Sequence, residues 1–227
     1  MFLLCNPATF LAITALLGPV ATANFGPNFC SGKLDKENFV LEAESILVLP
    51  DVPSDNTGFA SLWLGMGTSN GDLIQANVVA DGQPSTVFPD IWEVQAYVLK
   101  ESGFQQRMHG GTATRGDRIT LNYKYNPSTG NYDQTVMMND AVIATLSTES
   151  GQAMGVGSAV ECATEVNCGT MGAHQWLNTR IVLNVPDKHF GKNSGKVGGV
   201  TTGAWVTTDG GRTWTMEVAH IPEYKFS

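Results

Sequence analysis

Residues 60–66 read Ala-Ser-Leu-Trp-Leu-Gly-Met, residues 72–78 read Asp-Leu-Ile-Gln-Ala-Asn-Val, and residues 91–99 read Ile-Trp-Glu-Val-Gln-Ala-Tyr-Val-Leu. Each segment is short, rich in aliphatic and aromatic residues, and bounded by Gly, Pro, Asn, Asp or Ser. Such segments are typical of consecutive β-strands. We therefore expect the fold to be built around these three strands.

Polar and apolar residues alternate along the second and third segments. Gln75 and Asn77 share one face of their strand, and Gln95 and Tyr97 share one face of the next, whereas Trp92 lies on the apolar face opposite. A mostly polar face on adjacent strands suits the floor of a groove or pocket. The solvated outer face of a sheet is an equally good interpretation.

Short alternating segments continue to the C-terminal end of the chain, and helical periodicity is almost absent. Roughly twelve such strands predict an all-β fold, a single-domain antiparallel β-sandwich. Residues 24–36 are expected to form an irregular arm, and residues 201–207 and 213–219 a last hairpin. No internal repeat or linker is visible, so one domain is predicted over residues 24–227.

Residues 1–23 read as a secretory signal peptide. The stretch is apolar and uncharged, and it ends in Ala21-Thr22-Ala23, a small-x-small cleavage pattern. The apolar run is too short for a membrane span, so secretion is expected. The net charge of −8 then falls on the mature domain, which makes nucleic acid and anionic membranes poor partners.

The cysteines predict one disulfide at most. If Cys5 leaves with the signal peptide, Cys30, Cys162 and Cys168 remain. Cys162 and Cys168 flank a short loop and are the favoured pair in an oxidising compartment, although a bridge from Cys30 to one of them stays open. No metal site is expected, since no histidine spacing matches a structural zinc site.

Thr207 to Trp214 matches the Asp-box pattern of sialidase-like propellers. That pattern is a structural hairpin in which the aspartate, here Asp209, caps turn amides and the tryptophan packs beneath. Propellers carry several copies at regular spacing, and this chain has one. We therefore expect a local structural turn.

The order of motifs resembles the glutamic peptidases, or eqolisins, secreted fungal acid peptidases built as a concanavalin A-like jelly roll. The similar segments are residues 61–67, 73–77, 95–100, 116–119 and 160–165. The resemblance places Gln75 at the family's catalytic Gln and Glu161 at its catalytic Glu. It implies a pair in which a protonated Glu activates water and a Gln amide holds the oxyanion.

The sequence departs from the eqolisin pattern around that pair. The family's acidic positions fall on Gly67, Val79 and Leu99, and its Trp-rich strand has become Tyr97 and Lys100. Loss of several carboxyl groups from a site that must hold a proton favours a changed chemistry. A residual glutamic-type acid peptidase is kept as an alternative.

The chain is also similar to the hetero-Diels–Alderases of fungal tropolone sesquiterpenoid biosynthesis. The similarity lies in overall length, the signal-like start, residues 161–170, and the run His174-Gln175-Trp176-Leu177-Asn178-Thr179. It implies cycloaddition of a tropolone o-quinone methide, formed by dehydration of a hydroxymethyl tropolone, with a humulene-type alkene. Both partners are small apolar molecules, and the reaction needs no cofactor.

This chemistry assigns expected roles to the candidate residues. Gln75, Asn77 or Gln95 would donate hydrogen bonds to the heterodiene oxygen, and Glu161 or His174 would assist loss of water. The aromatic residues expected to contact substrate are Trp63, Trp92, Tyr97 and Trp176. Packing in the core stays open for Trp63 and Trp92, because an aromatic on a strand usually points inward.

Two further interpretations stay open. Concanavalin-like sandwiches often bind glycans, so a non-catalytic carbohydrate-binding module is the alternative from a different class. Arg107 and His109 share one face of their strand, which fits either a site or a solvated edge.

Overall fold

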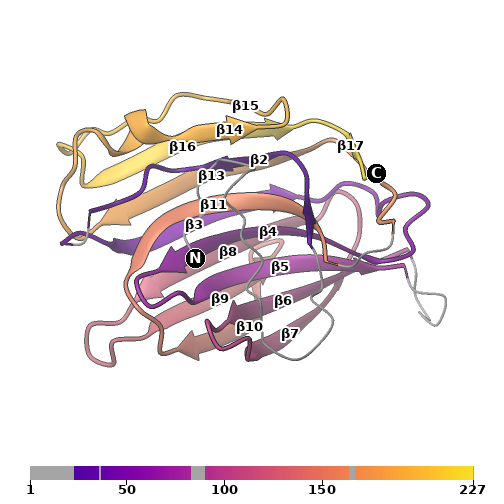
Figure 1. The fold of residues 1–227 in the computed structure, drawn as a ribbon, viewed down its shortest axis with the longest axis horizontal. Coiled ribbons are helices and arrows are strands. Elements are labelled where there is room, and N and C mark those ends of the chain that lie inside the picture. Colours follow the sequence, from indigo (N-terminus) through magenta and orange to yellow (C-terminus); the bar gives the residue numbers. More distant parts are fainter. Residues whose placement is uncertain (1–22, 36, 83–89, 164–166, 227) are drawn as a thin grey trace.

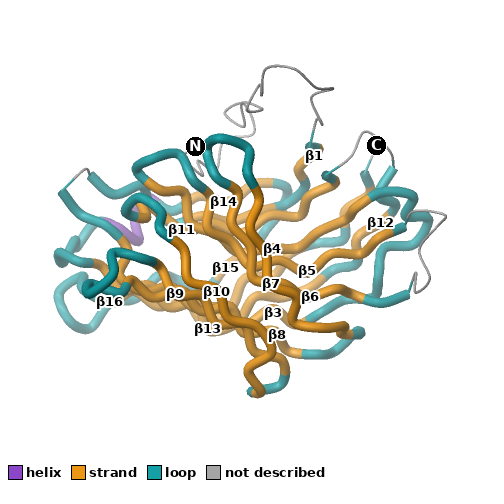
Figure 2. Tube along the Cα trace, turned by 90° about the horizontal axis from the view of Figure 1, so that it is seen from below, coloured by secondary structure: helices purple, strands orange, loops and turns teal. Residues whose placement is uncertain are grey.

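The computed structural model describes residues 23–35, 37–82, 90–163 and 167–226. Two antiparallel sheets pack face to face, with β4, β5 and β6 in one layer and β3, β8 and β13 in the other (Figures 1 and 2). The predicted all-β sandwich is confirmed. The proposed signal peptide lies almost entirely outside the described residues.

We call the larger sheet sheet A. Its strand order is β14-β2-β11-β4-β5-β6-β7, and β1 pairs with β11 in addition. The bounds are β1 Asn24–Phe25, β2 Asn28–Cys30, β4 Phe59–Thr68, β5 Leu73–Asp81, β6 Trp92–Leu99, β7 Gln105–Ala113, β11 Ala153–Cys162 and β14 Gly195–Val197. The three strands expected from the sequence are the neighbours β4, β5 and β6 of this sheet.

The other large sheet, sheet B, has the order β10-β9-β8-β3-β13-β16-β15. The bounds are β3 Val40–Val48, β8 Arg118–Tyr125, β9 Tyr132–Met138, β10 Ala141–Thr148, β13 His174–Leu183, β15 Thr201–Thr202 and β16 Thr213–Ile221. A small third sheet pairs β12 (Thr170–Met171) with β17 (Tyr224–Lys225), and a short 3-10 helix, η1, spans Phe190–Asn193.

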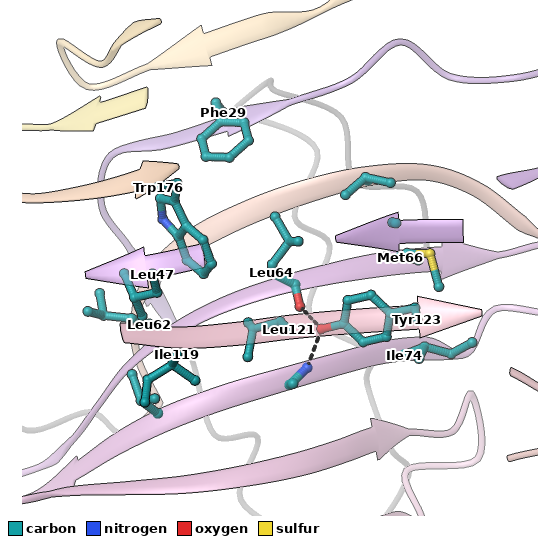
Figure 3. Close-up of a cluster of buried hydrophobic side chains, with 14 of the residues drawn as sticks. Phe29, Leu47, Leu62, Leu64, Met66, Ile74, Ile119, Leu121, Tyr123 and Trp176 are labelled. Atoms are coloured by element: carbon teal, nitrogen blue, oxygen red, sulfur yellow. Dashed lines mark hydrogen bonds between the residues drawn. The ribbon is translucent and has the colours of Figure 1, made fainter. Parts of the chain in front are cut away.

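One face of each large sheet supplies the core. Leu62, Leu64 and Met66 of β4 point into it, and Leu121 and Tyr123 of β8 meet them from sheet B (Figure 3). Burial of this apolar surface is the main stabilising contribution to such a sandwich. The alternation predicted for β5 and β6 is therefore present, with one face in the core and the other pointing away from it.

Two expectations at the ends of the domain are corrected. The segment expected as an irregular arm contains β1 and β2, which pair with β11. The predicted strand over residues 201–207 is limited to β15, with an isolated bridge at Val206. The segment between β15 and β16 instead forms the turn described next.

The Asp-box segment is a capped turn, as predicted. The carboxylate of Asp209 accepts hydrogen bonds from the backbone N–H groups of Arg212 and Thr213 at 3.1 and 2.9 Å. Trp214 is buried beneath the turn, where its ring packs against Phe190. The segment is a structural device that starts β16.

Candidate functional site

The candidate site is the face of sheet A that points away from the core. Alternation and register place on this outer face the side chains of Trp63 (β4), Gln75 and Asn77 (β5), Gln95 and Tyr97 (β6), Arg107 and His109 (β7), and Glu161 (β11). Cross-strand pairing orders them in rows. One row runs Gly65–Gln75–Tyr97–Arg107, and the next runs Trp63–Asn77–Gln95–His109.

A small apolar cluster with members from β1 to β6 lies on this face. Trp63 and Ala159 are neighbours in register, and together with Leu73 they form a buried group separate from the main core. Phe25 of β1 and Leu99 of β6 pack against it. Sequence reasoning missed Phe25, because a two-residue strand in a Gly- and Pro-containing arm gives no periodic signal.

Trp63 of this cluster and Glu161 form a hydrogen-bonded pair. The indole Nε1–H of Trp63 donates to Oε2 of Glu161 at 2.5 Å. Burial raises the pKa of the Glu161 carboxyl above its ordinary value, and the hydrogen bond from Trp63 opposes this only in part. Glu161 therefore keeps its proton to a higher pH than an exposed glutamate does.

Three amide side chains in the middle of the face are buried without full hydrogen bonding. Gln75, Asn77 and Gln95 are 6%, 7% and 6% exposed. Within the described part of the chain, six buried side-chain nitrogen or oxygen atoms lack a hydrogen-bond partner, and three of them are the carbonyl oxygens of these amides. An unsatisfied buried acceptor costs about 1–3 kcal/mol. Three unsatisfied acceptors on two neighbouring strands mark a place where the N–H or O–H groups of a bound molecule can donate hydrogen bonds.

Tyr97 lies between the acidic and the basic ends of the face. Burial and the charge of Glu161 together raise the pKa of its phenol to about 12, and the charge of Arg107 opposes this increase. The phenol is therefore neutral and able to donate a hydrogen bond at any physiological pH. Its backbone carbonyl accepts a hydrogen bond from Gln134 of sheet B at 3.2 Å.

The backbones of Gln75 and Glu161 are offset from each other on the outer face of sheet A. Gln75 is in register with Gly65, and Gly65 with Gly157, which precedes Glu161 by four residues on β11. The two backbones are thus offset by about 13 Å along the strands and about 10 Å across them. Both side chains lie on the same outer face, and the charge of Glu161 acts on Tyr97, the residue in register with Gln75.

Two expected substrate contacts, Trp92 and Trp176, are corrected. Trp92 and Trp176 are fully buried in the main core between the sheets, and the indole N–H of Trp92 donates to the carbonyl oxygen of Pro50 at 3.0 Å. Each sits at an inward position of its strand, beside other apolar residues. Neither side chain reaches the outer face of sheet A.

His174 is also placed elsewhere, on β13 of sheet B. It lines a pocket of about 290 Å³ at the ends of β13 and β16, together with residues that include Gln175, His220 and Ile221. Its Nδ1 lies 3.0 Å from the carbonyl oxygen of Gly172, and burial lowers its pKa to about 4. The imidazole is therefore neutral, and Nδ1 carries the proton because a carbonyl can only accept.

The predicted disulfide between Cys162 and Cys168 is confirmed, with a Cα–Cα distance of 5.7 Å. It closes the segment that directly follows Glu161 and so tethers the end of β11. Because Cys162 and Cys168 bond to each other, neither of them pairs with Cys30. Disulfides are typical of proteins of the secretory pathway.

The described residues contain neither a metal cluster nor a membrane-spanning helix. Among them, no group of three or more His, Cys, Asp or Glu side chains is arranged to hold a metal ion. In the same part of the chain, no helix is long and apolar enough to cross a bilayer.

Comparison with solved structures finds the fold among peptidases and lectins. The chain is similar to scytalido-glutamic peptidase in complex with a peptide-based transition-state analogue, with a TM-score of 0.50 and 10% identity over 87% of this chain and 98% of that chain. It is also similar to SCP-B, a member of the eqolisin family (TM-score 0.45, 8% identity, 87% and 98% covered), and to CG-16, a chicken liver agglutinin (0.37, 12%, 66% and 98%).

No protein-family model matches the chain. No curated protein matches its sequence. At such identities the likeness is one of fold, and it confirms the concanavalin-like, eqolisin-like sandwich expected from the sequence.

Proposed function

We propose that the outer face of sheet A catalyses, without a cofactor, the intermolecular hetero-Diels–Alder cycloaddition of a tropolone o-quinone methide with a humulene-type sesquiterpene. The resemblance to fungal hetero-Diels–Alderases suggests the reaction. The observation that carries the assignment to this face is the group of unpaired amide oxygens on Gln75, Asn77 and Gln95, next to the Trp63–Glu161 pair. The disulfide supports the expectation that the protein is secreted.

The amides suit the cycloaddition step. One C–C bond and one C–O bond form, no atom is lost, and no electron acceptor is needed. Catalysis then consists of holding the two partners face to face and stabilising charge on the heterodiene oxygen, to which an amide N–H can donate. The unpaired amide oxygens can in turn accept the O–H of a sesquiterpene alcohol such as humulenol.

Glu161 suits the preceding loss of water. In a hydroxymethyl tropolone whose ring enol is ionised, the Glu161 proton would pass to the leaving hydroxyl and the C–O bond would break, which gives the quinone methide, water and a Glu161 carboxylate that solvent protonates again. The products are one water and the neutral heterodiene, so the step involves no oxidation. A buried carboxyl with a raised pKa is the kind of acid that this step needs.

The apolar cluster suits the hydrocarbon partner. Phe25 and Leu99, the partly buried members of the cluster, offer apolar surface to a sesquiterpene and pack against the buried Trp63 and Leu73. An apolar wall also keeps water from a quinone methide, which would otherwise add water back.

The test is a product assay with purified protein, the hydroxymethyl tropolone precursor and humulenol. We expect a higher rate of dihydropyran formation, or a changed stereoisomer ratio, relative to buffer. Gln75→Ala and Glu161→Gln should lose this effect, whereas Gln175→Ala, an exposed glutamine on sheet B, should keep it. A product profile identical to that in buffer would refute the proposal.

The two alternative functions receive less support from the site. A glycan-binding platform needs an exposed planar aromatic, and Trp63 is 1% exposed. A glutamic-type peptidase needs Gln75 and Glu161 together, and the register offsets their backbones by four residues along the strands. Binding on a glycan array would favour the carbohydrate-binding module. Casein hydrolysis near pH 3 would favour the peptidase.

A further inference from the structure

The basic end of the outer face lies on β7, the edge strand of sheet A. Arg107 is in register with Tyr97, and His109 with Gln95, so these two exposed side chains continue the rows of buried polar residues. The rows therefore pass from buried amides through a neutral phenol to a cationic rim. A side chain at this rim can contact a molecule that lies over Gln75 and Tyr97.

Arg107 has no counter-ion in the described part of the chain. The ion pairs found there involve other residues, and no carboxylate lies within 4.0 Å of its guanidinium. The protein is acidic overall, with 21 acidic and 13 basic residues. The Arg107 guanidinium is exposed beside buried polar groups, and its planar set of five N–H donors fits an oxyanion.

The charge of Arg107 acts on the neighbouring part of the outer face, since it opposes the increase in the pKa of Tyr97. The charge of Arg107 shifts the pKa of the Tyr97 phenol in one direction and that of Glu161 shifts it in the other. The phenol therefore lies within electrostatic range of both groups. A ligand in contact with Tyr97 is within the field of the Arg107 cation.

We infer that the ligand of the outer face carries an ionised acidic oxygen, an enolate, phenolate or carboxylate, which Arg107 binds at the β7 rim while hydroxyl groups of the ligand meet the amide oxygens. The inference rests on the proposed function for the location of the site, but not for the reaction. A hydroxymethyl tropolone fits this class, because its ring enol is a vinylogous acid. A neutral hydrocarbon does not.

Calorimetric titration with benzoate and with benzyl alcohol, a neutral molecule of similar size, tests the inference on the full chain. Arg107→Gln should lower the affinity for benzoate on the order of tenfold and leave the affinity for benzyl alcohol unchanged. Arg118→Gln, an exposed arginine on β8 of sheet B, should bind benzoate as the wild type does. Added salt should weaken benzoate binding in the wild type more than in Arg107→Gln.

Each outcome decides the inference separately from the reaction. Equal benzoate affinity in wild type and Arg107→Gln, equal losses for both probes, or no benzoate binding up to its solubility limit would overturn it. If benzoate binding depends on Arg107 and no cycloadduct forms, the proposed reaction fails and the acidic ligand class stands. If cycloadduct forms and is indifferent to Arg107→Gln, the reverse holds.

Discussion

The phenol oxygen of Tyr123 accepts a hydrogen bond from the backbone N–H of Ala76 at 2.6 Å (Figure 3). The same hydroxyl donates to the carbonyl oxygen of Leu64 at 2.5 Å, so a side chain of sheet B bridges β4 and β5 of sheet A. Ala76 stands between Gln75 and Asn77. The core thus fixes the backbone that presents two of the three unpaired amides.

Removal of that hydroxyl should weaken both the fold and the site. In Tyr123→Phe the buried N–H of Ala76 and the carbonyl of Leu64 lose their shared partner, which we expect to lower the free energy of unfolding by about 1–3 kcal/mol. Urea denaturation followed by fluorescence measures the loss.

Tyr132 provides the matched control. Its hydroxyl also joins the two sheets, donating to the carbonyl of Val40 at 2.6 Å and accepting from the N–H of Ala153 at 3.0 Å, away from the amides. Tyr132→Phe should cost similar stability and leave ligand binding on the outer face unchanged. Equal binding losses in both variants would show that Tyr123 does not position Gln75 and Asn77.

Glu161 should make the protein less stable as the pH rises. Burial raises its pKa in the folded state, so the folded protein holds this proton more tightly than the unfolded chain does. The stabilising contribution of the Glu161 carboxyl is therefore fully present below pH 4.5, the ordinary pKa of a glutamate. It is lost as the pH rises through the folded-state pKa. Thermal unfolding of wild type and Glu161→Gln across this range should diverge with increasing pH, with the variant the more stable. Glu93→Gln, an exposed change on the same face, should follow the wild type.

His174 should act in the opposite direction. Burial lowers its pKa from 6.5 to about 4, so the unfolded chain binds the proton first as the pH falls. Between those values the free energy of unfolding should drop, by up to about 3 kcal/mol for a shift of this size. His174→Gln should lack that slope, and His220→Gln, an exposed histidine in the same pocket, should retain it. Parallel curves for wild type and His174→Gln would contradict the assignment.

Gly65 keeps space open beside Gln75. A Cβ added there would lie 3.0 Å from Cβ of Gln75 and 3.3 Å from a methyl group of Leu73. Gly65→Ala should therefore displace the glutamine and reduce product formation or benzoate binding, at a cost of about 1–3 kcal/mol in stability. Gly172→Ala meets only Pro50, at 3.4 Å, and is the comparison variant. Unchanged binding in Gly65→Ala would show that Gln75 does not contact the ligand.

Local pattern predicted the sheet strands and their faces well. Alternation along β5 and β6 depends on a two-residue period that tertiary contacts do not alter, so Gln75, Asn77, Gln95 and Tyr97 were correctly grouped. Which face of a strand meets the core is a property of the whole sandwich. Trp92 shows this. Alternation places it on the apolar face of β6, and it is buried because the second sheet packs against that face.

Long-range placement could not be read from single segments. The backbone offset between Gln75 and Glu161 depends on the register of β11 against β4. His174 lies away from the outer face of sheet A because its strand, β13, belongs to sheet B. The Cys162–Cys168 bridge could be predicted, since its loop is short. The sequence contains no sign of the hydrogen bonds that Tyr123 makes to β4 and β5. It shows only that Tyr123 belongs to the apolar face of β8.

The alternation along β5 gives this scaffold a practical advantage for protein engineering. Positions 75 and 77 can be randomised in a library while positions 74, 76 and 78 keep the sandwich intact. Altered selectivity should therefore evolve on this strand at little expense to thermostability.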